Sequence, residues 1–207
     1  MTLKLNGSTS GSVSIDAPAS TTGGADLTYT LPNATTGGII RTTTTPGAIL
    51  QVVQSKYTAT NSSTVNDGAD WDLETVWSGT ITPTATSSKI LVSMMISIGN
   101  GSASPVPAYL KRKIGSGSAA AVQAPDSYSS RTPATIVIPC THTHHGSAGF
   151  LTFLDSPNTT DACKYWVTLR HQTGASNTIY LNRSSVDSDD TSYSRAISNM
   201  VLQEVAG

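Results

Sequence analysis

The stretch KILVSMMISIG, residues 89–99, places an apolar side chain at every second position from Ile90 onward. Successive side chains of a β-strand point to opposite faces, so this stretch predicts a strand with one continuous apolar face. The residues of that face are Ile90, Val92, Met94, Ile96 and Ile98. Such a face has to be buried, and we expect it to form part of a two-sheet core.

The opposite face of this strand is mixed. It combines Leu91 and Met95 with Ser93 and Ser97. A half-apolar outer face predicts either a covering loop or contact with another subunit.

Further strand candidates follow residue 46 at the spacing of a sandwich, which predicts an all-β, jelly-roll-like β-sandwich domain over residues 46–207. The predicted strands span residues 49–57, 71–81, 89–98, 108–114, 134–142, 150–154, 164–171, 178–182 and 196–205. The boundary before this domain is placed at TTTTPG, residues 42–47, because Pro46 disfavours helix before it and Gly47 permits a turn.

Residues 1–45 are predicted to form a separate segment of very short strands. Glycine and proline interrupt it so often that it cannot build a core by itself. Its apolar positions are Leu3, Leu5, Val13, Ile15, Leu27, Tyr29 and Leu31. We expect these residues to order against sister chains or a larger particle, as an anchor or shaft.

The composition supports a β-rich chain with a weakly charged surface. The 207 residues include 31 Thr and 29 Ser but only two Glu, and 12% of residues are charged, with a formal net charge of −1. Scattered cations argue against nucleic-acid binding, and the absence of a long apolar run argues against membrane insertion. No signal-peptide pattern follows Met1, so we expect cytoplasmic synthesis and free thiols at Cys140 and Cys163.

Several short motifs resemble small fibre and appendage proteins of tailed bacteriophages, especially marine cyanophages. They are LNGSTSGSVSIDAPA, LTYTLP, PGAILQVVQ, TPTATSSKILV, FLDSP, YLNRS and LQEVA. The resemblance implies a non-enzymatic virion protein, exposed on the particle and trimeric, with a slender N-terminal segment and a β-rich head. It implies other virion proteins of tail or capsid as partners, together with a glycan or protein of the host surface.

The motif CTHTHHG, residues 140–146, places His142 and His144 two residues apart. On a strand both would point the same way, and in a three-fold fibre six imidazoles at the axis would suit a transition metal. The alternative is a polar strand end whose histidines lie in solvent.

Two loops offer other binding chemistry. The loop of residues 119–133 carries Asp126, Tyr128 and Arg131, which would supply an acceptor, a stacking face and a donor to a receptor. A loop that covers a sheet or packs on a neighbouring subunit is the alternative there.

In VDSDDTSY, residues 186–193, carboxylates would suit Ca²⁺ or simply a solvated turn. They belong to Asp187, Asp189 and Asp190.

Aromatic side chains present a further choice between a glycan-stacking platform and a buried core. The candidates are Trp71, Trp77, Tyr109, Tyr128, Trp166 and Tyr180. Trp71 and Trp77 would share one face of an unbroken strand, and burial is the plainer interpretation.

No Gly-x-Ser-x-Gly elbow and no motivated carboxylate pair accompany these residues, so we expect no enzymatic activity. The functional alternatives are a fibre-like appendage for host attachment, a capsid decoration or head-fibre protein without a receptor, and a polysaccharide-degrading enzyme.

Overall fold

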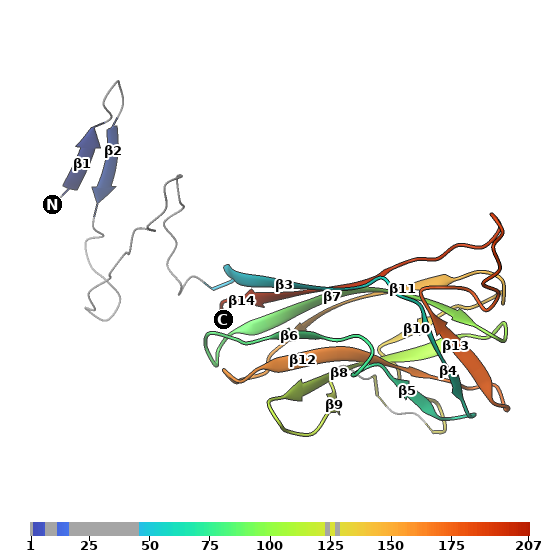
Figure 1. Ribbon diagram of the computed structural model, residues 1–207. Helices are drawn as coiled ribbons and strands as arrows, with labels where there is room; N and C mark the ends of the chain where they lie inside the picture. Colours follow the sequence, from blue (N-terminus) through green and yellow to red (C-terminus); the bar gives the residue numbers. More distant parts are fainter. Residues whose placement is uncertain (1, 7–11, 17–45, 123–124, 127–128) are drawn as a thin grey trace. The chain divides into compact units, whose positions relative to one another are not determined.

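The computed structural model describes residues 2–6, 12–16, 46–122, 125–126 and 129–207 (Figure 1). The chain divides into two compact units, Met1–Thr42 and Thr43–Gly207. Every regular element described is a strand, so the described part of the chain offers no helix that would span a bilayer.

The first unit contains an antiparallel hairpin of β1 (Thr2–Asn6) and β2 (Ser12–Asp16). Its register sets Leu3 opposite Ile15 and Leu5 opposite Val13. The strands predicted around these four residues are therefore confirmed, while their contact with sister chains stays a prediction. Leu27, Tyr29 and Leu31 lie outside the described residues.

The second unit is a sandwich of two antiparallel sheets, which confirms the predicted all-β sandwich. The β7 sheet consists of β3 (Ile49–Tyr57), β4 (Asn61–Val65), β7 (Lys89–Asn100), β11 (Ser147–Asp155), β13 (Asn177–Leu181) and β14 (Ser198–Val205). The β12 sheet consists of β5 (Asp70–Asp72), β6 (Gly79–Ile81), β8 (Val106–Ile114), β9 (Ala120–Ala121), β10 (Ile136–Ile138) and β12 (Cys163–Arg170).

Two predicted strands differ from the structure. Residues 71–81 form β5 and β6 with a turn between them, where Leu73 O accepts hydrogen bonds from the backbone nitrogens of Val76 (3.0 Å) and Trp77 (2.8 Å). The strand predicted over 134–142 shrinks to β10, because Pro139 follows it and has no N–H to continue the ladder.

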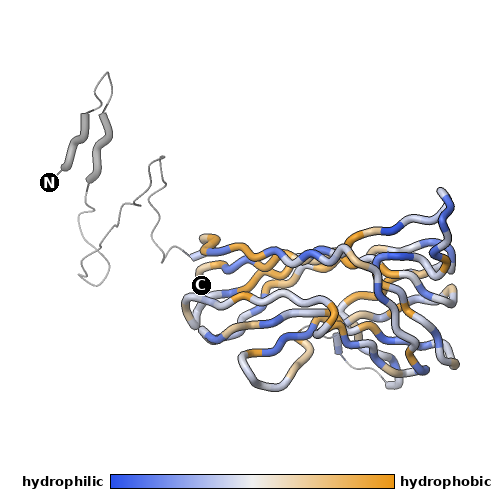
Figure 2. Tube along the Cα trace, in the orientation of Figure 1, coloured by the Kyte–Doolittle hydropathy of each residue, from blue (hydrophilic) through white to orange (hydrophobic). Residues whose placement is uncertain are grey.

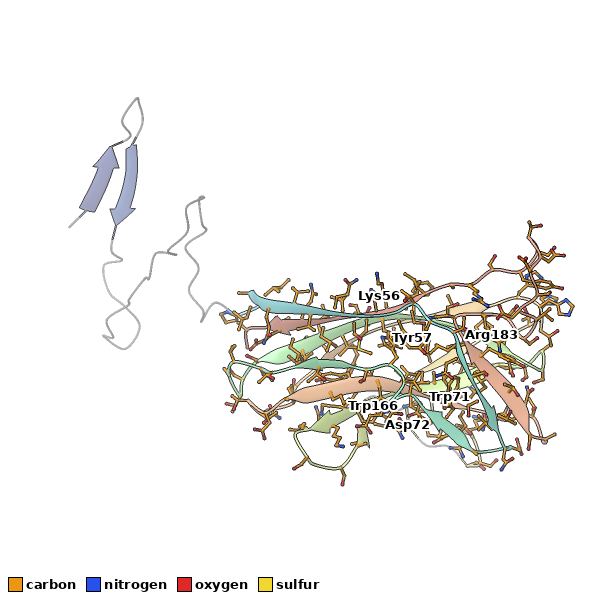
Figure 3. The ribbon with its side chains drawn as sticks, in the orientation of Figure 1. Lys56, Tyr57, Trp71, Asp72, Trp166 and Arg183 are labelled. Atoms are coloured by element: carbon orange, nitrogen blue, oxygen red, sulfur yellow. The ribbon has the colours of Figure 1, made fainter. Side chains whose placement is uncertain are left out.

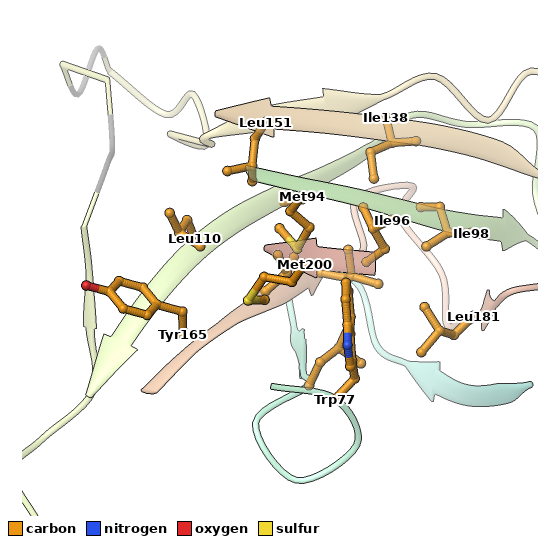
Figure 4. Close-up of a cluster of buried hydrophobic side chains, with 14 of the residues drawn as sticks. Trp77, Met94, Ile96, Ile98, Leu110, Ile138, Leu151, Tyr165, Leu181 and Met200 are labelled. Carbon is orange, nitrogen blue, oxygen red and sulfur yellow. The ribbon is translucent and has the colours of Figure 1, made fainter. Parts of the chain in front are cut away.

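The core lies between the two sheets, and both contribute to it (Figure 4). The predicted inner face of residues 89–98 is fully buried, since Ile90, Val92, Ile96 and Ile98 have no exposed surface and Met94 is 4% exposed. Cys140 and Cys163 are free and buried in this core, as expected. Burial raises the pKa of the Cys140 thiol to about 11.

One edge of β7 is shared by two strands in succession. Residues 89–95 pair with β14, and residues 98–100 pair with β13. The backbone of Ser97 lies at the gap between these partners. The Ser198 hydroxyl accepts from Ser97 N (3.1 Å), and Ser97 O accepts from Asn182 N (2.8 Å). The gap therefore leaves no buried backbone group of Ser97 unpaired.

Asn182 holds this junction through its side chain. It is fully buried and adopts a left-handed φ of 62°. Its amide nitrogen donates to Tyr57 O and Ala59 O, both at 2.8 Å, while its amide oxygen accepts from the Ser198 hydroxyl at 2.7 Å. One side chain thus ties the turn after β3, the end of β13 and the start of β14 together.

A second buried polar group, Glu204 of β14, fastens the loop that precedes β7. Its carboxylate accepts from Ser88 Oγ (2.7 Å), from the backbone (2.6 Å) and hydroxyl (2.7 Å) of Thr84, and from Gln51 Nε2 (2.7 Å). Burial alone would raise the pKa of Glu204, but these hydrogen bonds outweigh it and hold the pKa below its usual value.

The two sheets are also joined by a polar contact. The Asp155 carboxylate of β11 accepts from Arg112 (2.6 Å) on β8 and from the Tyr165 hydroxyl (2.7 Å) on β12. Burial and the neighbouring carboxylate raise the pKa of Tyr165, so its hydroxyl stays a donor at neutral pH.

Replacing Asn182 by glycine should destabilise the protein by about 3 kcal/mol, because the carbonyls of Tyr57 and Ala59 and the buried hydroxyl of Ser198 lose their partner. Glycine tolerates the left-handed backbone, so the loss reports the hydrogen bonds rather than φ. Chemical denaturation measures it. Asn158→Gly is the control, since Asn158 has φ 53° but is exposed. Equal effects at both positions would contradict the role of Asn182.

Replacing Glu204 by glutamine should cost about 1–3 kcal/mol at pH 7, because the donors of Ser88, Thr84 and Gln51 lose a charged acceptor. The pKa of Glu204 is lowered on folding. The carboxylate's contribution is therefore complete above the unfolded pKa, about 4.3, and disappears as pH falls through the folded pKa.

Denaturation curves at pH 7 and near pH 3 should thus show the gap between wild type and Glu204→Gln closing in acid. The matched control is Glu74→Gln, whose carboxylate pairs at the surface with Lys113 (3.5 Å) and Lys164 (3.3 Å) and should change stability by less than about 0.5 kcal/mol. A gap that persists unchanged in acid would rule out the ionised carboxylate as its source.

Candidate functional site

The strands of the sandwich run between two ends (Figure 1), which carry different groups. At the Lys89 end of β7, Ala206 O accepts from Gly47 N and Ala206 N donates to Ala48 O, both at 2.8 Å, so the described chain enters and leaves there. At the Asn100 end, β11 begins and β13 ends. The loops of residues 139–146 and 182–197 therefore lie at this opposite end, which we call the far end.

These two far-end loops form one surface. The backbone nitrogen and the hydroxyl of Ser185 both donate to Thr143 O, at 3.1 and 2.6 Å. The rings of His144 and Tyr193 meet edge to face with their centroids 6.0 Å apart. Loops from distant parts of the sequence are thus held side by side.

A shallow pocket of about 220 Å³ opens in this surface and is lined by His142, Thr143, His144 and His145. The three imidazoles are exposed, and the rings of His142 and His145 pack edge to face at 5.6 Å. The sequence-based premise that His142 and His144 share a strand face is wrong, because residues 140–146 form a loop after Pro139.

The described residues of a single chain do not form a metal site. Within the described ranges, no three His, Cys, Asp or Glu side chains are grouped to hold an ion. A site that combines His142 and His144 from several chains stays a prediction.

The acidic loop uses its carboxylates on its own chain. Asp187 accepts two hydrogen bonds from Arg195, at 2.9 and 2.7 Å, and lies 3.9 Å from Arg183. Arg195 lowers the pKa of Asp187. Asp190 accepts from Ser192 N at 2.7 Å, and Asp189 is exposed. The three carboxylates are therefore not assembled as calcium ligands in the described chain, which leaves the alternative of a solvated turn.

The predicted receptor loop borders the β12 sheet. Its ends are tied to β8, because Val122 N donates to Leu110 O (3.1 Å) and Thr135 N donates to Ala108 O (2.8 Å). Asp126 and Arg131 are exposed. Tyr128 lies outside the described residues, so its role in receptor binding stays a prediction.

For most of the aromatic candidates, burial holds and the alternative of a glycan-stacking platform does not. Four of its members are buried, namely Trp71, Trp77, Tyr109 and Trp166. Trp166 is covered even though it lies on the outer side of the β12 sheet (Figure 3). The ring of Tyr180 is covered by the guanidinium of Arg183, 4.2 Å from its centroid. The ring faces at these positions are therefore already in contact with other parts of the protein.

Sequence reasoning missed three residues of the far end, namely Arg183, Tyr193 and Arg195. Only the position of Arg183 within YLNRS hinted at importance, because pairing across a loop leaves no periodic signal. With the exposed imidazoles, these side chains offer donors and partly apolar faces. Such a surface suits hydrogen bonding and stacking against a polyhydroxylated or anionic ligand.

A scan against protein-family models finds no match, and a search of curated proteins finds none either. Among solved structures, a similar chain occurs in "Structure of infectious bursal disease virus Gt strain". The identity is 13%, the TM-score is 0.36, and the alignment covers 98% of this chain and 46% of that one. This chain therefore spans less than half of the other's length, and a similarity at this level carries no functional argument.

Replacing Asp187 by asparagine should loosen the loop of residues 183–195, because Arg195 and Arg183 lose their shared carboxylate. We expect amide hydrogen exchange in this loop to rise roughly tenfold. Asp187 has a lowered pKa, so its pairing is complete above about pH 3.9 and is lost as pH falls through the folded pKa. Asp189→Asn is the control in the same loop, and equal exchange in both variants would contradict the pairing.

Proposed function

We propose that this chain is a structural protein of a tailed-phage virion, a fibre-like appendage that assembles as a homotrimer and contributes to attachment at the host surface. It acts by assembly and binding rather than by catalysis. Residues 1–45 join it to the particle or to sister chains, and the sandwich is presented outward on the virion.

The observation that carries this proposal is the difference between the two ends of the sandwich. The described chain enters and leaves at the Lys89 end of β7, while the linked loops with exposed histidines occupy the far end. A module fastened at one end and furnished with polar, hydrogen-bonding loops at the other has the layout of an attachment head.

The phage-like motifs support the same proposal at the level of the fold. Their residues coincide with the buried polar contacts of the sandwich. SSKILV contains Ser88, FLDSP contains Asp155, YLNRS contains Asn182 and LQEVA contains Glu204. The resemblance therefore concerns residues that hold the sandwich together, and it leaves the ligand of the far end open.

Attachment would rely on several weak contacts acting together. Copies joined through residues 1–45 would each present one far end, and linkage raises the effective concentration of every further contact. A shallow polar pocket is adequate for this mode, because no single site has to bind tightly.

The location of the protein on purified particles tests the proposal. Gold-labelled antibody should mark the tail or its fibres. Gold on the head would instead support the alternative of a decoration or head-fibre protein, and would contradict the tail-appendage proposal. Release of reducing ends from host polysaccharide would overturn the non-enzymatic assignment in favour of the polysaccharide-degrading alternative.

Binding of labelled protein to host cells tests the far end. We expect His144→Ala with Tyr193→Ala to weaken cell binding at least about tenfold, because an edge contact and a donor are lost in every copy. Asp126→Ala with Arg131→Ala tests the loop predicted from sequence and should change binding less. The reverse order would move the receptor contact to that loop, and no binding by wild type would contradict attachment.

A further inference from the structure

The outer faces of the two sheets differ sharply in charge. On the β12 sheet, cations and carboxylates alternate in ion pairs. Lys111 lies 3.5 Å from Asp72, and Lys113 and Lys164 lie 3.5 and 3.3 Å from Glu74. Such a surface is compatible with permanent exposure to water.

The outer face of the β7 sheet is built differently. The register aligns Phe150, Met95, Asn199 and Lys56 in one row, and Leu154, Leu91, Gln203 and Val52 in another. We call this surface the β7 outer face. Its apolar members are Ile49, Val52, Leu91, Met95, Phe150, Leu154, Val201 and Val205.

The apolar side chains of the β7 outer face are open to solvent in the single chain. Phe150 is 68% exposed and Val52 is 57% exposed. Four of the six large apolar side chains that are exposed in the described residues lie here, the other two being Val137 and Ile197. The covering loop that the sequence allowed for Leu91 and Met95 is not found among the described residues.

Charge is nearly absent from the β7 outer face. Lys56 and Lys89 are its cations, and none of the described acidic residues lies on it, since Asp155 and Glu204 of its strands point into the core. Its polar positions are neutral, as in the hydrogen bond from Gln54 to Asn199 at 2.8 Å. Depletion of charge around aromatic, Met and aliphatic side chains is the composition of an interface core. Figure 2 shows apolar and polar positions alternating along the sandwich strands.

The size of the face also suits an interface. Four strands about 4.8 Å apart, each contributing about nine residues at 3.4 Å, cover roughly 600 Å². Two such faces pressed together would bury about 1,200 Å², the lower end of the range for specific and stable protein interfaces.

We propose that the β7 outer face is a self-association surface, buried against the same face of a second copy of this chain in a two-fold contact that is separate from assembly through residues 1–45. Apolar side chains need no charged complement, so one copy can cover another, with the amides of Gln54, Asn199 and Gln203 meeting like groups. β3, the edge strand of this face, begins directly after Gly47 and Ala48. The inference concerns the sandwich alone and does not depend on host attachment.

Analytical ultracentrifugation of the full chain tests the proposal. We expect wild type to form oligomers at about 10 µM, and Val52→Lys with Phe150→Lys to raise the dissociation constant at least about tenfold through like-charge repulsion between copies. The control is Val137→Lys, since Val137 is also 57% exposed but lies on β10 of the other sheet. A monomeric wild type would overturn the proposal.

A readout without substitutions guards against misfolded variants. Peroxide oxidation of Met95 on this face should slow as protein concentration rises, while Met94 and Met200 remain protected by the core at every concentration. Oligomers that persist in the double variant, with Met95 oxidised equally at all concentrations, would overturn the proposal. They would assign assembly to residues 1–45 and leave the face open to a different partner, without contradicting the proposed virion role.

Discussion

The sandwich depends on the way β7 divides one of its edges between two strands. A strand that changes partners halfway along must leave a gap in its hydrogen-bond ladder. If the gap is buried, each backbone N–H or C=O left without a partner there costs about 1–3 kcal/mol. Asn182 and Ser198 fill that gap around Ser97, and Asn182 reaches on to the carbonyls of Tyr57 and Ala59. β13 and β14 can therefore both pair with the same edge of β7.

Two further buried polar groups act in the same manner. Glu204 fastens the loop before β7, and Asp155 joins β11 to two strands of the facing sheet. Each collects hydrogen bonds from several elements, which explains how a chain so rich in Ser and Thr keeps a specific architecture. Ser and Thr hydroxyls, such as those of Ser88 and Thr84, donate hydrogen bonds over short distances, and a single carboxylate such as that of Glu204 accepts several of them. Such contacts preserve a fold while the exposed loops remain free to vary.

The proposed function rests on the surfaces of the sandwich that these buried contacts hold in place. One end carries the chain connections, the far end carries imidazoles and guanidinium groups, one sheet face is charged, and the other is apolar and nearly uncharged. Three of these surfaces match the parts of the proposed function and the proposed self-association: a fastening, an outward binding end and a contact between copies. The charged face is the one best suited to remain in water.

The alternation in residues 89–99 determined the β-sandwich and its core, because a period of two can bury only one side of a strand. It also foretold the half-apolar face around Leu91 and Met95. Only the tertiary structure decided what depends on contacts across the chain. Trp71 and Trp77 are separated by a turn instead of sharing one strand. Trp166 is buried although it lies on the outer side of its sheet. The ring of His144 packs against that of Tyr193 and does not align with His142. Periodicity reports which side of a strand is buried, whereas partners some 50 or 100 residues away are set by how the sheets pack.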